Sequence, residues 1–391
     1  MSQAYMHPQH ESRLLSVPIE IRRAIYANAV PRQIHVFLSQ GKLRLSACLE
    51  PNLGDHRHDG RERGRDHVVG SNVRDPEAEA RWAGRLRSSW GPHWQCEELT
   101  LSDEGAPSHN SRRHDISNLL FSCKKLFTDV LDMVAERTAF NVTDTVTMNV
   151  LLSKSDDPGS SSDCPWSFCD HVVPNIRRLN LTFRLPVAFY EDLEYGIGSA
   201  LSRDRPADNL ELTSHSKWAY VWSTIHRLQQ LRSLYIWLDH DGRRSWSVVK
   251  ERLALHHLIE GLTVQKQFRR AKELPPTEIS VNLPKLHPGI SGPLTHFVGD
   301  GPQLPFTIER RYRQRFHCRQ DASGRLAVEY EADFPILYEI SELQETSGDL
   351  TGDIITLEEI EDLEERMWER GENVNGVMNE LYGMCIHWGN M

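Results

Sequence analysis

The sequence predicts a mixed fold, between α+β and α/β, with strands that are partly parallel. A strand pattern with the same spacing of apolar residues occurs twice in the middle of the chain. Amphipathic helical patterns separate these strands, and the order strand–helix–strand implies right-handed crossovers between parallel neighbours. Apolar residues make up 39% of the chain and the mean hydropathy is −0.51, a globular composition diluted by polar segments.

The repeated strand pattern covers residues 175–183 and 230–238. Leu179 and Leu181 of the first copy match Leu234 and Ile236 of the second, at a constant offset of 55 residues. A looser third copy of the strand pattern lies at 277–283. Helical patterns occupy 187–201, 215–230 and 246–262. The unit resembles a leucine-rich-repeat coil with long helices, although its period exceeds the roughly 20–29 residues of ordinary repeats. A solenoid and a small α/β layer both fit this pattern.

The N-terminal part predicts a helix over 14–29 and a β-hairpin over 33–47. Ser16 is a suitable N-cap, and Pro18 suits the first helical turn, where its missing amide hydrogen is not needed. Apolar and polar residues then alternate on both sides of Gly41, which favours a tight turn between two strands.

The composition divides the chain into five segments. Residues 1–12 are expected to be a flexible N-terminus, and 13–50 to form the helix and hairpin. Residues 51–115 predict a mostly disordered insertion, because 55–67 is almost entirely charge, His and Gly; tryptophans in its second half could dock onto the body. Residues 116–335 predict the α/β body, and 336–391 an acidic helical segment.

Within these last two segments, local patterns predict individual elements. Residues 116–135 form a strong amphipathic pattern, and 138–142 predict a short strand. Residues 304–330 predict a hairpin that turns at 321–324. The sequence Thr-Leu-Glu-Glu at 356–359 is a capping box that opens a helix with one apolar face.

Charge, hydropathy and cysteine usage exclude several classes of protein. The net charge of −10 disfavours a general nucleic-acid binder. No apolar run approaches the roughly 20 residues that span a bilayer, and the N-terminus has no apolar core of the kind that secretory signals carry. We therefore expect an intracellular protein of the cytoplasm or nucleus. Seven scattered cysteines fit free thiols in a reducing compartment. The sequence predicts no cofactor and no metal.

The residues at 14–26, Leu-Leu-Ser-Val-Pro-Ile-Glu-Ile-Arg-Arg-Ala-Ile-Tyr, resemble the first helix of F-box-like proteins. Later patches, Leu-Leu-Phe-Ser-Cys at 119–123 and Thr-Ala-Phe-Asn-Val at 138–142, follow in the order found in a large fungal family of uncharacterised F-box-like proteins. Ile-Trp-Leu-Asp-His-Asp at 236–241, followed by Trp246, also resembles a motif of that family. The chain departs from an F-box domain after the first helix, where a hairpin replaces two further helices.

The resemblance implies that the N-terminal helix contacts an adaptor of a cullin-type ubiquitin ligase. Leu15, Pro18, Ile21 and Ile25 would carry this contact. The alternative is that the helix packs against the helix at 116–135 and forms part of an internal core, as amphipathic helices commonly do.

A second candidate site is formed by Asp239, His240 and Asp241, which follow the strand at 230–238. Parallel sheets bind ligands at the C-terminal ends of their strands. Acidic and histidine side chains there could bind a metal or act as acid and base. The alternative is that these turn residues cap the next helix.

Two further groups contain possible metal ligands. Cys164, Cys169 and His171 lie close in sequence, but their four-residue gap and the missing fourth ligand argue against zinc. A histidine group in the charged insertion has no cysteine and no fixed spacing, which favours a solvated loop: His56, His58 and His67.

Five arginines interleave with Tyr312 and Phe316, a pattern that could hold phosphates and stack bases. On a strand the aromatic residues would face the core and the arginines the solvent, or pair with acids at 358–365. These arginines are Arg310, Arg311, Arg313, Arg315 and Arg319.

These observations predict a non-enzymatic protein-interaction protein, in which the F-box-like helix binds a ligase adaptor and the α/β body binds a substrate protein. One alternative is a small-molecule or metal-dependent enzyme with its site near Asp239, His240 and Asp241. Another is a scaffold or regulatory protein of unknown partner. No membrane association is expected.

Overall fold

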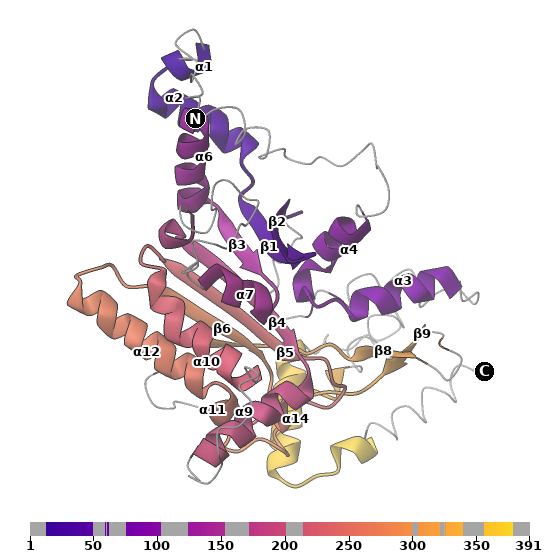
Figure 1. Cartoon of the computed structure of the whole chain (residues 1–391). Coiled ribbons are helices and arrows are strands. Elements are labelled where there is room, and N and C mark those ends of the chain that lie inside the picture. Colours follow the sequence, from indigo (N-terminus) through magenta and orange to yellow (C-terminus); the bar gives the residue numbers. More distant parts are fainter. Residues whose placement is uncertain are drawn as a thin grey trace, which may run out of the picture.

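The computed structural model is arranged around one large β-sheet, with helices packed mainly on one side (Figure 1). The structure describes residues 13–49, 59, 61, 76–102, 124–152, 172–200, 214–298, 304–320, 324, 326–338 and 356–377. Among these, no helix is long and apolar enough to cross a membrane.

The large sheet has seven strands in the order β2-β1-β3-β4-β5-β6-β7. All neighbouring pairs are parallel except β1 with β2, which is the predicted hairpin. Its turn uses Gln40 and Gly41, both with positive φ, the geometry that tight hairpin turns require. The prediction of a mixed α/β fold with parallel strands is confirmed. The strands are β1 Gln33–Ser39, β2 Lys42–Ala47, β3 Ala139–Val142, β4 Arg178–Leu185, β5 Ser233–His240, β6 Glu278–Pro284 and β7 Thr307–Arg311.

The sequence repeat corresponds to the register of the sheet. Leu179 pairs with Leu234 and Leu181 with Ile236, so positions 55 residues apart are neighbours on β4 and β5. The looser third copy is β6, where Ile279 pairs with Leu234. The repeat thus marks adjacent strands of one open sheet, and the resemblance to leucine-rich-repeat coils stays an expectation.

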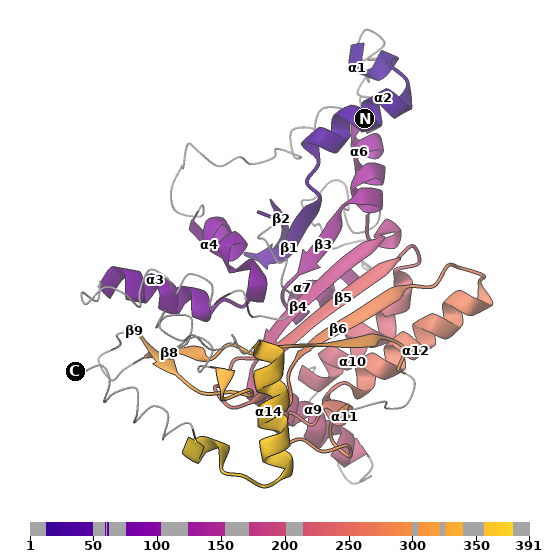
Figure 2. The same ribbon diagram turned by 180° about the vertical axis from the view of Figure 1, so that it is seen from behind.

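One face of the sheet is apolar and is covered by helices. Figure 1 shows the helices in front of the strands, and Figure 2 shows the strands from behind, with these helices on the far side. Their tryptophans Trp218 and Trp222 are fully buried, and Trp218 contacts Phe183 of β4 edge-on at 5.9 Å. The helices are α7 Thr145–Leu152, α9 Val187–Ala200, α10 Ser214–Thr224, α11 Glu251–Ala254 and α12 His256–Ala271.

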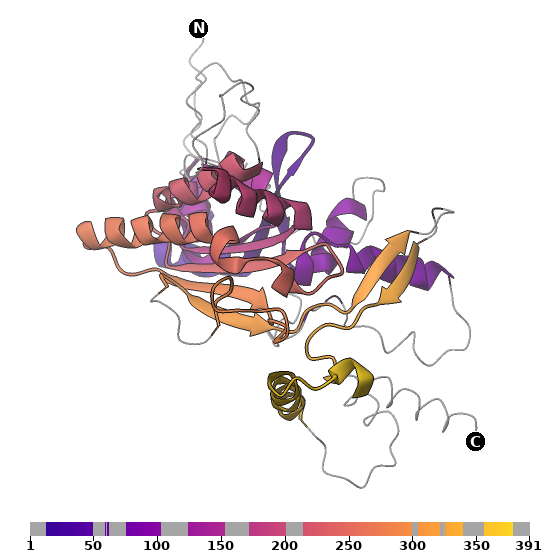
Figure 3. The same ribbon diagram turned by 90° about the horizontal axis from the view of Figure 1, so that it is seen from below.

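The other face of the sheet is polar and aromatic, because strand residues alternate between the two faces. The Asn180 amide donates to Asn141 at 2.9 Å, and Asn141 donates to Gln33 at 3.3 Å, which links β4, β3 and β1 through side chains. Trp237 lies on this same face of β5 and is buried. Figure 3 shows α14, Leu357–Glu369, on the side of the sheet opposite the helical layer.

Part of the insertion at 51–115, expected to be mostly disordered, is ordered. It contains the helices α3 Pro76–Leu86 and α4 Trp94–Ser102 and the short helix η2 Gly91–His93. Gly91 allows η2 to approach the polar face, since its φ is positive and a Cβ there would lie 3.0 Å from Thr182 and 3.2 Å from Trp237. Apolar contacts with the sheet, including buried Trp90, therefore outweigh the polar composition of the segment.

Several predicted elements are subdivided. The N-terminal helix is split into α1 Arg13–Ser16 and α2 Ile19–Ala29, and Ser16 donates to Arg13 O instead of capping α2. The predicted helix at 246–262 is broken into η5 Trp246–Val248, α11 and α12, and the other short helices are η3 Val173–Asn175 and η4 Ile225–Arg227. Within its described residues, the amphipathic stretch at 116–135 forms α6 Lys124–Arg137.

The predicted hairpin at 304–330 is wrong in its first strand. Residues of β7 join the large sheet beside β6, and the hairpin is formed by β8 Phe316–Gln320 with β9 Leu326–Tyr330. The capping box at the start of α14 is confirmed, because Thr356 and Glu359 exchange both hydrogen bonds. On this helix Ile360 and Met367 are buried but Leu363 is exposed.

Close packing of α12 on α10 depends on Gly261. A Cβ at this position would lie 2.3 Å from the carbonyl oxygen of Trp222, so we expect Gly261→Ala to lower the free energy of unfolding by about 3 kcal/mol or more. Gly84 on α3 has open space around it, and Gly84→Ala should raise the free energy by about 0.5–1 kcal/mol. Urea denaturation of both variants measures the difference, and equal effects would contradict this packing.

Candidate functional site

The N-terminal helix α2 has an inner face that packs on the protein and an outer face that does not. Tyr26 is buried, and Arg22 forms an ion pair of 3.0 Å with Asp129 of α6. Ile21 and Ile25, one helical turn apart, are 52% and 48% exposed. The inner face therefore packs on α6 as the internal-core alternative expects, and the contact of the outer face with an adaptor stays an expectation.

The other two residues of the predicted adaptor surface differ from each other. Pro18 is exposed and precedes the first residue of α2, so it continues the outer face that Ile21 and Ile25 form. Leu15 is partly buried and packs against the large core. Pro18, Ile21 and Ile25 therefore form the outer face of α2.

The three residues at the end of β5 do not converge on a common site. Asp239 is buried on the polar face, while His240 is buried and stacks on Trp246 with 5.8 Å between the ring centroids. Asp241 is exposed and accepts a hydrogen bond from the backbone amide of Val187, at the start of α9. The predicted capping role therefore belongs to Asp241 alone, and it acts on a different helix from the one expected.

Asp239 is surrounded by three guanidinium groups. Arg313 Nε donates to its carboxylate at 2.8 Å, and Arg61 Nη2 lies at 3.2 Å and Arg311 Nη2 at 3.6 Å. Arg61 also pairs with Asp59, so two residues of the charged insertion are buried at the sheet. Arg61 and Arg311 both contact the ring of Trp237, at 5.6 Å and 3.9 Å.

This charge cluster fixes the protonation of its members. Burial alone would raise the pKa of Asp239, but Arg313, Arg311 and Arg61 outweigh it and hold the pKa far below its ordinary value. Burial and the nearby Arg313 lower the pKa of His240 to about 4. A carboxylate that stays ionised and contacts three guanidinium groups is suited to holding β5, β7 and the inserted segment together. It is poorly suited to accepting a proton from a substrate.

The arginine-rich segment is buried instead of facing solvent, which corrects the expectation from the sequence. Arg311, Arg313 and Arg315 are at most 8% exposed. Arg310 forms a two-pronged ion pair with buried Glu251, at 2.5 and 2.9 Å. The strand on which the expectation relied ends at Arg311, and in the following residues internal carboxylates and carbonyl groups bind the guanidinium groups. These arginines are therefore not disposed to hold an external phosphate.

The aromatic residues of that segment behave largely as predicted. Tyr312 is buried and donates to Glu361 of α14 at 2.8 Å, and Phe316 is half-buried. The predicted contact with the acids at 358–365 therefore exists, but Tyr312 and Lys285 make it, through Glu361, and the arginines do not. Arg319 is exposed and pairs with Glu329 within the β8–β9 hairpin.

The cysteine and histidine groups weighed from sequence as zinc ligands lie outside the described residues, and a different set converges in space. His35 comes from β1, Cys48 follows β2, His93 ends η2 and Cys96 lies in the first turn of α4. Their donor atoms all lie within 4.8 Å of one another, and in the described part of the chain they form the one such group of three or more metal-binding side chains. The undescribed candidates are Cys164, Cys169, His171, His56, His58 and His67.

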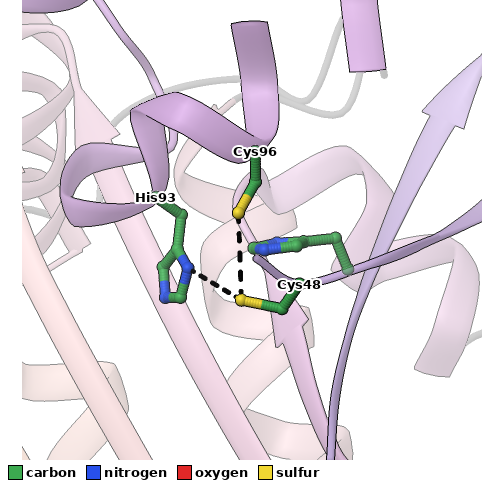
Figure 4. A group of neighbouring side chains, drawn as sticks. Cys48, His93 and Cys96 are labelled. Atoms are coloured by element: carbon green, nitrogen blue, oxygen red, sulfur yellow. Dashed lines mark hydrogen bonds between the residues drawn. The ribbon is translucent and has the colours of Figure 1, made fainter. Parts of the chain in front are cut away.

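The geometry of this group, the His–Cys cluster, is compact. Cys48 Sγ lies 3.8 Å from Cys96 Sγ and 3.4 Å from His93 Nδ1, and Figure 4 shows these three side chains pointing toward one another. His35 is fully buried, stacks on Trp90 at 4.6 Å and meets the His93 ring edge-on at 4.7 Å. The cluster thus sits where η2 and α4 cover the polar face of the sheet.

Local structure explains why these side chains meet. The Cys48 amide donates to Gln33 O at 3.0 Å and so continues the hairpin ladder beyond β2. The His93 amide donates to Trp90 O at 3.0 Å, which closes η2, and Gly91 brings that turn down onto β4 and β5. The hydrogen bond with Cys48 outweighs burial and holds the pKa of the Cys96 thiol well below its ordinary value. Burial lowers the pKa of His35.

Sequence reasoning selected none of these four residues. The signal that could have found them is the two-residue gap between His93 and Cys96, which is a common zinc-ligand spacing. The other pair, His35 and Cys48, is brought together by the predicted hairpin, yet nothing in the sequence indicates that η2 lies beside it.

The fold and its buried clusters define an α/β protein with a seven-stranded, mostly parallel sheet whose polar face is covered by an inserted segment. The chain belongs to the family described as Domain of unknown function (DUF7730), whose model matches residues 7–272, more than half of the chain. The matched range includes α2 and all four residues of the His–Cys cluster. No curated protein and no solved structure matches the chain.

Removal of the Asp239 charge should strongly destabilise the protein. Asp239→Asn leaves three buried guanidinium groups without this counter-charge, and we expect a loss of about 3–5 kcal/mol in the free energy of unfolding. Asp241→Asn is the matched control, since Asn caps helices as well as Asp does, and should change the free energy by less than about 0.5 kcal/mol. Chemical denaturation distinguishes the two, and similar losses would argue against the cluster.

The buried His240 should make stability depend on pH. Its pKa is about 4 in the folded protein and 6.5 ordinarily, so between these values only the unfolded chain binds the proton. Its contribution is therefore complete above pH 6.5 and falls by up to about 1.4 kcal/mol per unit as the pH drops toward 4. His240→Asn should show a flatter dependence of unfolding free energy on pH over this window. An unchanged slope would show that other groups cause it.

Proposed function

We propose that this chain is a non-enzymatic protein-interaction protein that uses the outer face of α2 to bind an adaptor, as an F-box-like substrate receptor of a ubiquitin ligase. The observation that carries the proposal is the exposure of Ile21 and Ile25 on a helix that is anchored to the body by its other face. The resemblance of residues 14–26 to an F-box helix names the partner class.

The position of α2 favours contact with a partner. Figures 1 and 2 show α1 and α2 at one extremity of the molecule, with α2 beside α6 and away from the helical layer. The Arg22–Asp129 ion pair and buried Tyr26 fix the orientation of α2, so the outer face is preorganised. An amphipathic helix that presents aliphatic residues one turn apart is a common mode of partner recognition.

The departure from an F-box domain limits the size of this contact. The chain passes from α2 into the β1–β2 hairpin, so one helix and the preceding Pro18 would provide the apolar part of the adaptor surface. The α/β body would then present a substrate protein at a fixed distance from the adaptor. An interface of this size is expected to be transient in the absence of substrate.

The alternative enzyme reading receives less support from the contacts at the end of β5. Asp239 is buried and already occupied by Arg313, Arg61 and Arg311, and Asp241 faces a different element. A scaffold or regulatory role would use the same kind of exposed helix face and differs from the leading proposal in the identity of the partner.

The test is co-purification of the full-length chain with a purified adaptor of a cullin-type ligase. Ile21→Asp with Ile25→Asp should reduce adaptor recovery at least tenfold, because each buried isoleucine contributes about 1.5–3 kcal/mol and tenfold corresponds to about 1.4 kcal/mol. Both positions are exposed, so the variant should keep the wild-type circular dichroism and melting temperature.

The matched control is Val264→Asp, a similarly exposed aliphatic residue on α12, at 54% exposure. This variant should recover as much adaptor as the wild type. The proposal is wrong if wild-type protein recovers no adaptor, or if the α2 double variant and the Val264→Asp variant behave alike.

A further inference from the structure

We propose that His35, Cys48, His93 and Cys96 form a structural Zn²⁺ site that fastens the β1–β2 hairpin to η2 and α4. This inference is independent of the adaptor-binding proposal, since the four residues belong to the polar face of the sheet and α2 contributes none of them.

The spacing of the donor atoms matches a tetrahedral zinc ion. With Zn–S bonds of about 2.3 Å and Zn–N bonds of about 2.0–2.1 Å, a tetrahedron places two sulfurs about 3.8 Å apart and a sulfur and a nitrogen about 3.5 Å apart. The observed separations are 3.8 Å for Cys48 Sγ to Cys96 Sγ and 3.4 Å for Cys48 Sγ to His93 Nδ1. These two separations match the edges of a zinc tetrahedron, and all four donor atoms lie within 4.8 Å of one another.

The same sulfur separation is too long for a disulfide, whose S–S bond is about 2.05 Å. A hydrogen bond between the two thiols would explain the 3.8 Å between the sulfur atoms. It does not explain why nitrogen atoms of His35 and His93 lie within 4.8 Å of both sulfurs. Both ring nitrogens of His35 are buried, and among the described residues neither makes a well-formed hydrogen bond; the nearest polar partner is the Cys96 thiol, a weak hydrogen-bonding group. A buried imidazole with so little compensation is costly, and coordination of one nitrogen to a metal removes that cost.

The donor set selects the metal and its role. Two thiolates and two imidazoles form the Cys₂His₂ combination of structural zinc sites, whereas magnesium and calcium require oxygen ligands. Four protein ligands complete a tetrahedron and leave no position for water or substrate, so the ion would be structural and not catalytic. The Leu49 amide donates to Cys96 Sγ at 3.4 Å, a contact that would stabilise a metal-bound thiolate.

The site would join parts of the chain that are distant in sequence. Cys48 and Cys96 are 48 residues apart, and the intervening residues include the buried Asp59 and Arg61 of the charge cluster. Zinc at this point would close that loop and hold η2 against the polar face. The order of η2 and α4 in a polar part of the chain is then explained, because metal binding supplies stabilisation that a small apolar core does not.

The experiment uses the full-length chain purified without chelators. Elemental analysis by mass spectrometry should find about one zinc per chain, as a closed four-ligand site requires. With zinc bound, Cys48 and Cys96 should resist alkylation, and peptide mapping after addition of a chelator should show both becoming reactive. Cobalt substitution should give the intense visible absorption of tetrahedral Co²⁺ with sulfur-to-metal charge transfer.

Variants assign the ligands. Cys48→Ser with Cys96→Ser should lower the zinc content at least tenfold, and Cys318→Ser, in the β8–β9 hairpin, should leave it unchanged. If the double serine variant fails to fold, Cys96→His keeps four ligands and should retain the zinc. It should also weaken the sulfur-to-cobalt charge-transfer band, because one thiolate remains.

Three results would overturn the assignment. The first is wild-type protein that carries no zinc and does not take it up when Zn²⁺ is added. The second is recovery of a Cys48–Cys96 disulfide from freshly purified protein. The third is bound zinc that leaves both cysteines as reactive as they are after chelation, which would place the metal elsewhere.

Discussion

The alternation of side chains along the parallel strands is the constraint on which the rest of the structure depends. Strands β3 to β6 direct one set of residues to an apolar face, where helices cover them, and the intervening set to a polar face. A mostly parallel sheet is normally covered on both faces. The polar face is covered by η2, by Trp90 of the inserted segment and by arginines from distant parts of the chain, and both the charge cluster around Asp239 and the His–Cys cluster lie on that face.

The apolar half of this arrangement could be predicted from the sequence. The 55-residue offset between Leu179 and Leu234 equals their pairing on β4 and β5, because both positions had to match the same helical layer. The β1–β2 hairpin and the capping box at Thr356 are local features, so neighbouring residues were enough to predict them. The partner of β7 could not be predicted in this way, because β7 pairs with β6, and no local pattern determines the course of the connection between them.

The polar half could not be predicted, for a physical reason. Arg311 and Arg313 were expected in solvent because a charge is costly to bury alone, and the acids that neutralise them are Asp239, 74 residues from Arg313, and Asp59, farther still. The His–Cys cluster is of the same kind, since its ligands come from a hairpin and a helix that meet across the sheet. For the N-terminal helix, the residue pattern identified an apolar stripe but not that Leu15 packs against the core while Ile21 and Ile25 stay exposed.

The family match ends at residue 272, whereas two arginines that pair with buried acids lie beyond it. Arg313 pairs with Asp239, and Arg310 with Glu251. A chain emerging from the ribosome at about 5–20 residues per second presents Asp239 roughly 4–15 s before Arg313. During that interval Arg61 is the one available member of the three guanidinium groups around Asp239. The polar face around Asp239 should therefore close late in synthesis, because the end of β7 and the residues after it supply Arg311 and Arg313.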